Sequence, residues 1–292
     1  MAKFRLKMAA QLGEKVAAEA GFTQFPVSPL VIADANGIAV QAKPADVKGV
    51  SGALIFVGNE VTLIYSSEYS SGFQNFSIAH ELGHYFMPEH PQEIVRQGGT
   101  HLSRANFTES SSLELEADHF ASGLLLPSAL TRKFLSRHQM GLEGILMLAE
   151  AAECSLTAAA IRAAGCCPYP VAIVVSEGDK VAYAFLSDSF KELGSLAFLK
   201  KGSPLPQCAT RVFNADPENI RQAKRVCCET SLAVWFDGNS QVTLDEEVLG
   251  LGRYGYTLTI LSSESLPEDP GQNEDEDSEL NRSWTPRFAY GR

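Results

Sequence analysis

Two histidines and a glutamate stand at a spacing that suits metal chemistry, because residues 80–84 read His-Glu-Leu-Gly-His. Residues of an α-helix advance by about 100° each, so side chains four positions apart lie on the same face. In a helix, His80 and His84 would point to one position in space, as two ligands of a tetrahedral zinc ion must. Glu81 is offset from this row, where it could take a proton from a water molecule at the metal.

The neighbouring residues favour a helix at this position. Apolar side chains recur at spacings of three and four residues, as in an amphipathic helix: Phe76, Ala79, Leu82 and Phe86. Pro88 ends the pattern soon after the second histidine. Gly83 costs the helix about 1 kcal/mol relative to alanine, so we expect another backbone to approach closely there.

A third ligand is needed, because catalytic zinc binds three protein side chains and a water molecule. A second helix, expected over residues 112–126, carries Glu114 and Glu116 on opposite sides of its apolar stripe, so helical geometry alone does not choose between them. Asp118 lies one turn after Glu114, where its carboxylate could accept the far N–H of a ligand histidine and fix the tautomer. We therefore favour Glu114 as the ligand with Asp118 behind it, and Glu116 is the alternative.

The two motifs together resemble those of the ImmA/IrrE family of bacterial metallopeptidases, which are gluzincin-like. The resemblance is carried by residues 76–85 (FSIAHELGHY), 114–121 (ELEADHFA) and 124–127 (LLLP), with a similar lead-in at 26–33 and 37–40. It covers about the first half of the chain. The chain departs from the family at residues 72–75, which read Gly-Phe-Gln-Asn where members often carry an arginine.

This resemblance implies a zincin-like fold in which His80, His84 and a glutamate of the second motif bind Zn²⁺, with Mn²⁺ as the alternative ion. It also implies that Glu81 is the catalytic base. The implied substrate is a narrow one, a helix-turn-helix transcriptional repressor. Cleavage of that repressor would release genes of the DNA-damage response, other stress genes or mobile elements.

The chain reads as an α+β protein with four parts. They are a zinc metallopeptidase domain at residues 1–140, a helix-turn-helix-like segment at 141–168, a GAF-like sensor domain at 169–265, and an acidic, partly disordered tail at 266–292. In the first part we expect helices at 3–21 and 30–36, strands at 38–42, 51–56 and 61–65, and a polar loop from 89 to 112. His101 or Arg104 could reach the site and stabilise an oxyanion, but the favoured expectation is that these two and His90 are ordinary residues of that loop. An edge strand of the small sheet could pair with an extended substrate.

Within residues 142–164, the segments 145–152 and 155–162 read as two short helices that resemble a helix-turn-helix. The second helix offers little beyond Arg162 to contact phosphates or base edges, so a structural or protein-contact role is favoured over DNA binding. Farther along, strands are expected at 171–175, 180–185, 232–236 and 256–260, with a helix at 216–226. This arrangement is similar to the GAF-like domain of IrrE, which could take a small-molecule effector, although no motif identifies one.

The composition limits where the protein can act and what kinds of partner it can bind. The formal net charge of −11 argues against strong attraction to nucleic acid or anionic membranes. No apolar run is long enough to span a bilayer, and no secretory apolar region follows the basic start, so we expect a cytoplasmic protein. The six cysteines form no C-x-x-C pair and are expected to be buried reduced thiols, with redox sensing as the alternative.

Two functional hypotheses follow. The leading one is a zinc endopeptidase in which Glu81 activates water. The alternative is a non-proteolytic transcriptional regulator that binds DNA through residues 142–164 or senses a ligand through its C-terminal domain, with a structural zinc site. The acidic charge and the few basic residues of that segment weigh against DNA binding.

Overall fold

The computed structural model describes residues 2–43, 49–104, 112–138 and 141–263, so the tail expected at 266–292 lies outside the described residues. The chain divides into two compact units. The first comprises Met1–Phe134 and Met147–Ala159, and the second comprises Leu135–Leu146 and Ala160–Arg292. The domain boundaries expected near residues 140 and 168 stay a prediction.

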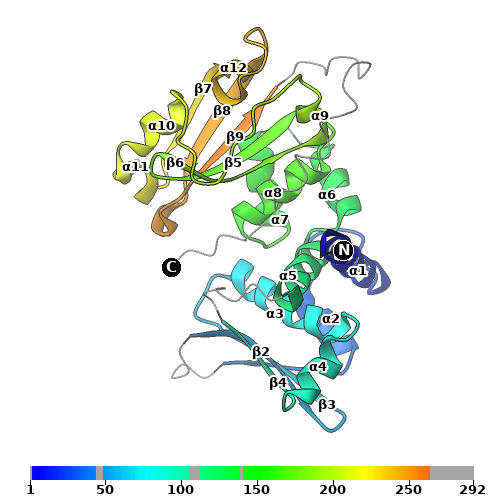
Figure 1. The fold of residues 1–292 in the computed structure, drawn as a ribbon. Coiled ribbons are helices and arrows are strands. Elements are labelled where there is room, and N and C mark those ends of the chain that lie inside the picture. Colours follow the sequence, from blue (N-terminus) through cyan, green and yellow to red (C-terminus); the bar gives the residue numbers. More distant parts are fainter. Residues whose placement is uncertain (1, 44–48, 105–111, 139–140, 264–292) are drawn as a thin grey trace. The chain divides into compact units, whose positions relative to one another are not determined.

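The first unit combines a small sheet with several helices (Figure 1). Its elements are α1 (Ala2–Glu19), α2 (Pro29–Ala35), β1 (Ala39–Ala42), β2 (Val50–Val57), β3 (Glu60–Tyr65), α3 (Ser71–Phe86), α4 (His90–Arg96), β4 (Thr100–Arg104), α5 (Ser112–Leu125) and α6 (Ser128–Leu135). The sheet has the order β1-β3-β2-β4, and it is mixed because β1 runs parallel to β3 while the other pairs are antiparallel. The expected helices and the first three strands are confirmed.

The loop expected from residue 89 to 112 was wrong, because the chain there forms α4 and the edge strand β4. Thr100 of β4 pairs with Ile55 of β2, and Leu102 pairs with Ala53. Hydrophobic alternation missed this strand because its polar side chains point inward: Ser103 is 3% exposed, whereas the apolar Leu102 is 54% exposed. An inward polar face on a strand is the reverse of the usual pattern.

Three helices pack together through glycines. A Cβ at Gly13 of α1 would overlap the Phe120 carbonyl oxygen of α5, and a Cβ at Gly123 of α5 would overlap the backbone of α1. The close approach expected at Gly83 of α3 is confirmed, since a Cβ there would lie 3.0 Å from the Cα atom of Ala117. The glycines therefore let α1, α5 and α3 stack at short range, which positions the side chains between them.

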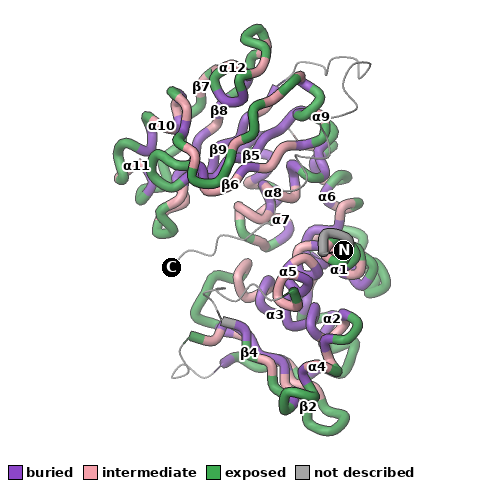
Figure 2. Tube along the Cα trace, viewed as in Figure 1, coloured by how far each residue is buried: buried purple, intermediate pink, exposed green. Residues whose placement is uncertain are grey.

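The second unit is built on a five-stranded antiparallel sheet. The chain enters it through α7 (Leu142–Ala151) and α8 (Leu156–Cys166), each of which has residues in both units. The strands β5 (Val171–Glu177), β6 (Lys180–Leu186), β7 (Arg225–Ser231), β8 (Thr243–Gly250) and β9 (Thr257–Ser262) lie in the order β6-β5-β9-β8-β7. Short helices α9 (Asp188–Lys191), α10 (Ala209–Asn214), α11 (Pro217–Arg221) and α12 (Leu232–Phe236) and the turn η1 (Gly252–Tyr254) accompany it. Figure 2 shows the central strands buried and the edge strand β7 largely exposed.

Two expectations for this unit were wrong. The strand expected at residues 232–236 is the helix α12, because an apolar run of five residues fits either structure and periodicity cannot choose. The helix expected at 216–226 ends at Arg221, and β7 follows from Arg225. That strand was not expected because its residues are mostly exposed and offer no alternation.

The six cysteines are free thiols, and Cys166, Cys167 and Cys208 are buried, whereas Cys227 is exposed. Among the described residues, no single helix has the length and apolar character to cross a membrane. The pair α7 and α8 meets these two criteria jointly, with a bend of 113° between its helices.

Candidate metal centre

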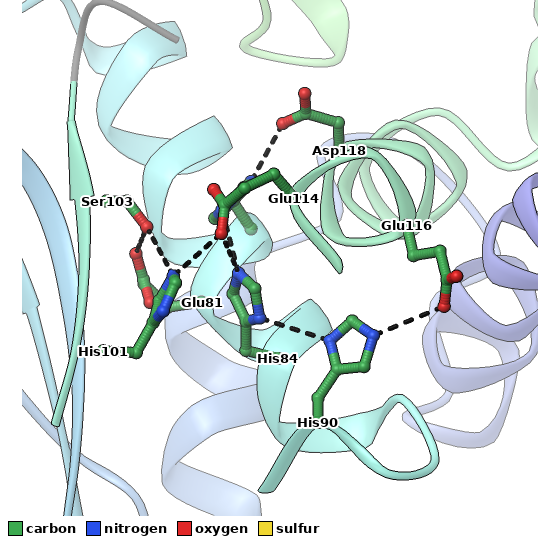
Figure 3. Close-up of polar contacts among 9 residues, drawn as sticks. Glu81, His84, His90, His101, Ser103, Glu114, Glu116 and Asp118 are labelled. Carbon is green, nitrogen blue, oxygen red and sulfur yellow. Dashed lines mark hydrogen bonds and ion pairs between the residues drawn. The ribbon is translucent and has the colours of Figure 1, made fainter. Parts of the chain in front are cut away.

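Helices α3 and α5 bring two histidines and a glutamate to one position (Figure 3). The Nε2 atom of His80 lies 3.2 Å from the Nε2 atom of His84, so both rings turn the same nitrogen to the same point. Glu114 of α5 faces them, with its Oε2 atom 3.3 Å from His80 Nε2 and its Oε1 atom 3.4 Å from His84 Nε2. Both histidines are 1% exposed, so little water competes for these atoms.

A fourth donor comes from the edge strand β4. The Nε2 atom of His101 lies 3.1 Å from Glu114 Oε1, and the ligand atoms of His80, His84, His101 and Glu114 all lie within 4.8 Å of one another. The expectation that His101 is an ordinary loop residue was wrong. Sequence reasoning undervalued it because β4 was not recognised as a strand; the alternation of His101 with Ser103 was the available signal.

Asp118 and Glu116 occupy different places around this cluster. Asp118 Oδ1 lies 2.9 Å from the Nδ1 atom of His80, on the far side of the ring from the cluster. Glu116 instead accepts hydrogen bonds from Arg5 and lies 3.3 Å from His90, outside the cluster. The geometry thus favours Glu114 over Glu116, while ligation itself stays a prediction.

Glu81 is fully buried between α3 and the sheet. Its Oε1 atom accepts a hydrogen bond of 2.6 Å from the Ser103 hydroxyl. Gly52 of β2 leaves room for it, since a Cβ there would lie 2.5 Å from Oε1. The Oε2 atom is buried and has no hydrogen-bond partner among the described residues. A buried carboxylate oxygen without a donor is costly, so it indicates a site that a ligand or water completes.

The charges of the site shift its pKa values in opposite directions. Burial would lower the pKa of His80, but hydrogen bonds and charges from Asp118 and Glu114 raise it well above its ordinary value. Burial lowers the pKa of His84 to about 3, which leaves this imidazole neutral. Burial raises the pKa of Glu81. For Glu114, hydrogen bonds from the surrounding histidines outweigh burial and lower its pKa far below the ordinary range.

This donor set fits a zinc ion. Imidazole nitrogen and carboxylate oxygen are ligands that zinc takes, and a neutral His84 is in the protonation state that a metal requires. If all four side chains bind, the site is closed, as structural zinc sites are. If His101 stays apart, His80, His84 and Glu114 leave an open position beside Glu81, as catalytic sites do.

Residues 33–164 match the model of the Peptidase_M78 family, described as the IrrE N-terminal-like domain. Among solved structures, a Mycobacterium tuberculosis transcriptional regulator matches with 15% sequence identity and a TM-score of 0.53 over 87% of this chain and 76% of that chain. At this identity the likeness concerns the fold alone. No curated protein matches the chain significantly.

Proposed function

We propose that this chain, whose residues 33–164 match the IrrE N-terminal-like domain of the M78 peptidases, is a zinc-dependent endopeptidase. One observation carries the proposal. The donor atoms of His80, His84 and Glu114 converge within 4.8 Å of one another, beside the buried Glu81. Two helices are thus arranged so that three ligands meet at one point next to a general base.

The ion and the side chains would divide the work of peptide hydrolysis. His80, His84 and Glu114 would hold the ion, and Asp118 fixes the tautomer of His80 by accepting its Nδ1–H. A zinc ion held there would lower the pKa of a water molecule towards about 7 and polarise the substrate carbonyl. Manganese is the alternative ion.

Glu81 takes the proton of the attacking water on Oε2, because Oε1 is already engaged by Ser103. Burial raises the pKa of Glu81, which makes it a better acceptor for this proton, and the acid formed then passes the proton to the leaving amine because the amine is the stronger base. His101 lies on the same side of the site as Glu81, with its Nε2 atom 3.3 Å from the Ser103 hydroxyl and its side chain 21% exposed (Figure 3). From there its N–H can stabilise the negative charge that develops on the carbonyl oxygen.

We further propose that the substrate is a helix-turn-helix transcriptional repressor and that the reaction takes place in the cytoplasm. The family resemblance supports this, and the structural neighbour is itself named a transcriptional regulator. In this proposal the five-stranded C-terminal unit is a GAF-like sensor that gates cleavage of the repressor in response to a small-molecule effector. The genes released would belong to a DNA-damage or other stress response or to a mobile element.

The test is Glu81→Gln in the full-length protein, incubated with zinc or manganese and the repressor encoded beside the gene. The rate of cleavage is measured by mass spectrometry of the fragments. We expect this rate to fall by at least about 100-fold, because a general base contributes that much. Metal content should stay unchanged. Glu60→Gln, at an exposed glutamate of β3, is the matched control. Full cleavage by Glu81→Gln would refute the mechanism.

A second candidate is a regulator with a closed, structural metal site, and the presence of four donors within reach of one ion favours it. His101→Ala separates the two. In a closed site the substitution removes a ligand and weakens metal binding strongly. In a catalytic site it leaves metal binding nearly intact and slows cleavage.

A further inference from the structure

We propose that the N-terminal helix α1 sets the metal affinity of the site through a line of hydrogen bonds from Arg5 by way of Glu116 and His90 to His84. The inference rests on the metal-binding part of the proposed function. It concerns positioning residues, since only His84 would touch the ion. Arg5 lies outside residues 33–164, the region that matches the peptidase family.

Each contact of the line is short enough for a hydrogen bond. Together the contacts determine which ring nitrogen of His84 and of His90 carries the proton. His84 turns Nε2 to the cluster, so its proton sits on Nδ1, which lies 3.2 Å from the Nδ1 atom of His90. His90 must accept there, so its own proton sits on Nε2, 3.3 Å from Glu116 Oε2. Arg5 then donates to both oxygens of Glu116, from Nε at 2.8 Å and from Nη2 at 3.1 Å.

Because these residues are buried, losing one contact of the line would leave a polar group without a partner. His90 is fully buried and the Glu116 side chain is 2% exposed. A buried carboxylate is costly unless a cation and hydrogen-bond donors compensate it, and Arg5 supplies both. Glu116 in turn keeps the His90 ring oriented as an acceptor for His84. An acceptor behind a ligand histidine fixes the ring and makes it a stronger donor to the metal.

The position of Arg5 is itself fixed by helix packing. Gly13 and Gly123 let α1 and α5 approach backbone to backbone, and Glu116 lies on that same α5 helix. The guanidinium therefore meets Glu116 from a rigid neighbouring element. Its outer side also contacts Glu89 at 3.4 Å, at the start of α4, which carries His90.

The experiment measures Zn²⁺ affinity of the full-length protein by competition with a chromophoric chelator. We expect Arg5→Met and Glu116→Gln each to weaken binding by up to about 10-fold, the low end of the effect of removing a direct partner of a ligand histidine, because they act on His84 through His90. The double variant should weaken it no more than the stronger single one, because both act through one line. Arg5→Lys should recover part of the loss. Lys15→Met, at an exposed lysine of the same helix, should change nothing.

A second readout does not depend on affinity. Nitrogen-15 NMR of the imidazoles should show the proton of His84 on Nδ1 in the wild type and a mixture of tautomers in Glu116→Gln. Circular dichroism and thermal unfolding of the metal-free variants separate this effect from loss of folding. Folded variants with wild-type affinity and an unchanged tautomer would overturn this proposal and leave the proposed function standing. A wild-type protein that binds neither zinc nor manganese would overturn both.

Discussion

His80 would couple metal binding at the proposed site to the release of a proton. In the metal-free site its ring is held between Asp118 on Nδ1 and Glu114 on Nε2, and these partners outweigh burial and raise its pKa well above the ordinary value. At neutral pH the ring therefore carries both protons. A metal ligand must offer a lone pair, so binding has to expel the proton from Nε2.

The affinity for zinc should therefore rise by up to tenfold per pH unit, because one proton is released. The rise should stop once the pH exceeds the pKa of His80. Titration calorimetry in two buffers of different ionisation enthalpy measures the number of protons released. Asp118→Asn removes one source of the raised pKa, so it should release fewer protons at pH 7. A binding enthalpy that does not depend on the buffer would contradict this account.

Among the residues of the site, the spacing along the sequence predicted those that lie close together in the chain. His80, Glu81 and His84 lie within one turn of one helix, so the pattern alone places them together. The choice between Glu114 and Glu116 depends on Arg5, which is 111 residues from Glu116 along the chain. No local pattern carries that information, and the preference for Glu114 came from Asp118 one turn later.

Among the elements, the stacking of α1, α5 and α3 depends on glycines at the crossings. Gly13→Ala would force a methyl group into the backbone of α5, and overpacking of this kind costs about 1–3 kcal/mol. Gly165→Ala is the matched control, because Gly165 is exposed in α8 and a Cβ there meets nothing within 4 Å. That change should stabilise the protein by about 0.5–1 kcal/mol.

Chemical denaturation of both variants measures the two effects, which should have opposite signs. Gly13→Ala should also weaken zinc binding, since α1 carries Arg5. A Gly13→Ala protein as stable as the wild type would show that the two helices are free to move apart.

The elements that sequence reasoning missed share a physical cause. Hydrophobic alternation finds a strand only when its apolar side chains face the core. In β4 the inward side chains are His101 and Ser103, which serve the site, and in β7 most side chains are exposed. In β8 the acidic Glu246 is fully buried, so a charged side chain did not mark a surface position there.

At the scale of the whole molecule, the chain divides into two compact units, and we expect them to unfold in separable steps. The second unit is held in part by Glu246, which accepts hydrogen bonds of 2.7 Å from both the backbone N–H and the hydroxyl of Thr210. It also accepts one of 3.3 Å from the indole of Trp235. Removing this carboxylate leaves buried donors unpaired, at a cost of about 1–3 kcal/mol for each.

Calorimetry should therefore show Glu246→Ala lowering one unfolding transition and zinc raising the other. At a free zinc concentration of about 1,000 Kd the metal contributes roughly 4 kcal/mol. Glu229→Ala, at an exposed glutamate of β7, should leave both transitions in place. A single transition that responds to both changes would mean that the units unfold together.

The position of β4 at the end of its sheet bears on which part of a folded protein could be cut. Within the described chain β4 pairs only with β2, so its outer edge has no partner strand there, and Ser103 of the same strand donates a hydrogen bond to Glu81. A chain that adds to this edge must be fully extended over several residues. Helices and turns cannot do so without melting. If the substrate is the repressor proposed above, it would therefore be cut in an unstructured linker between its folded parts, and shortening that linker should protect it from cleavage.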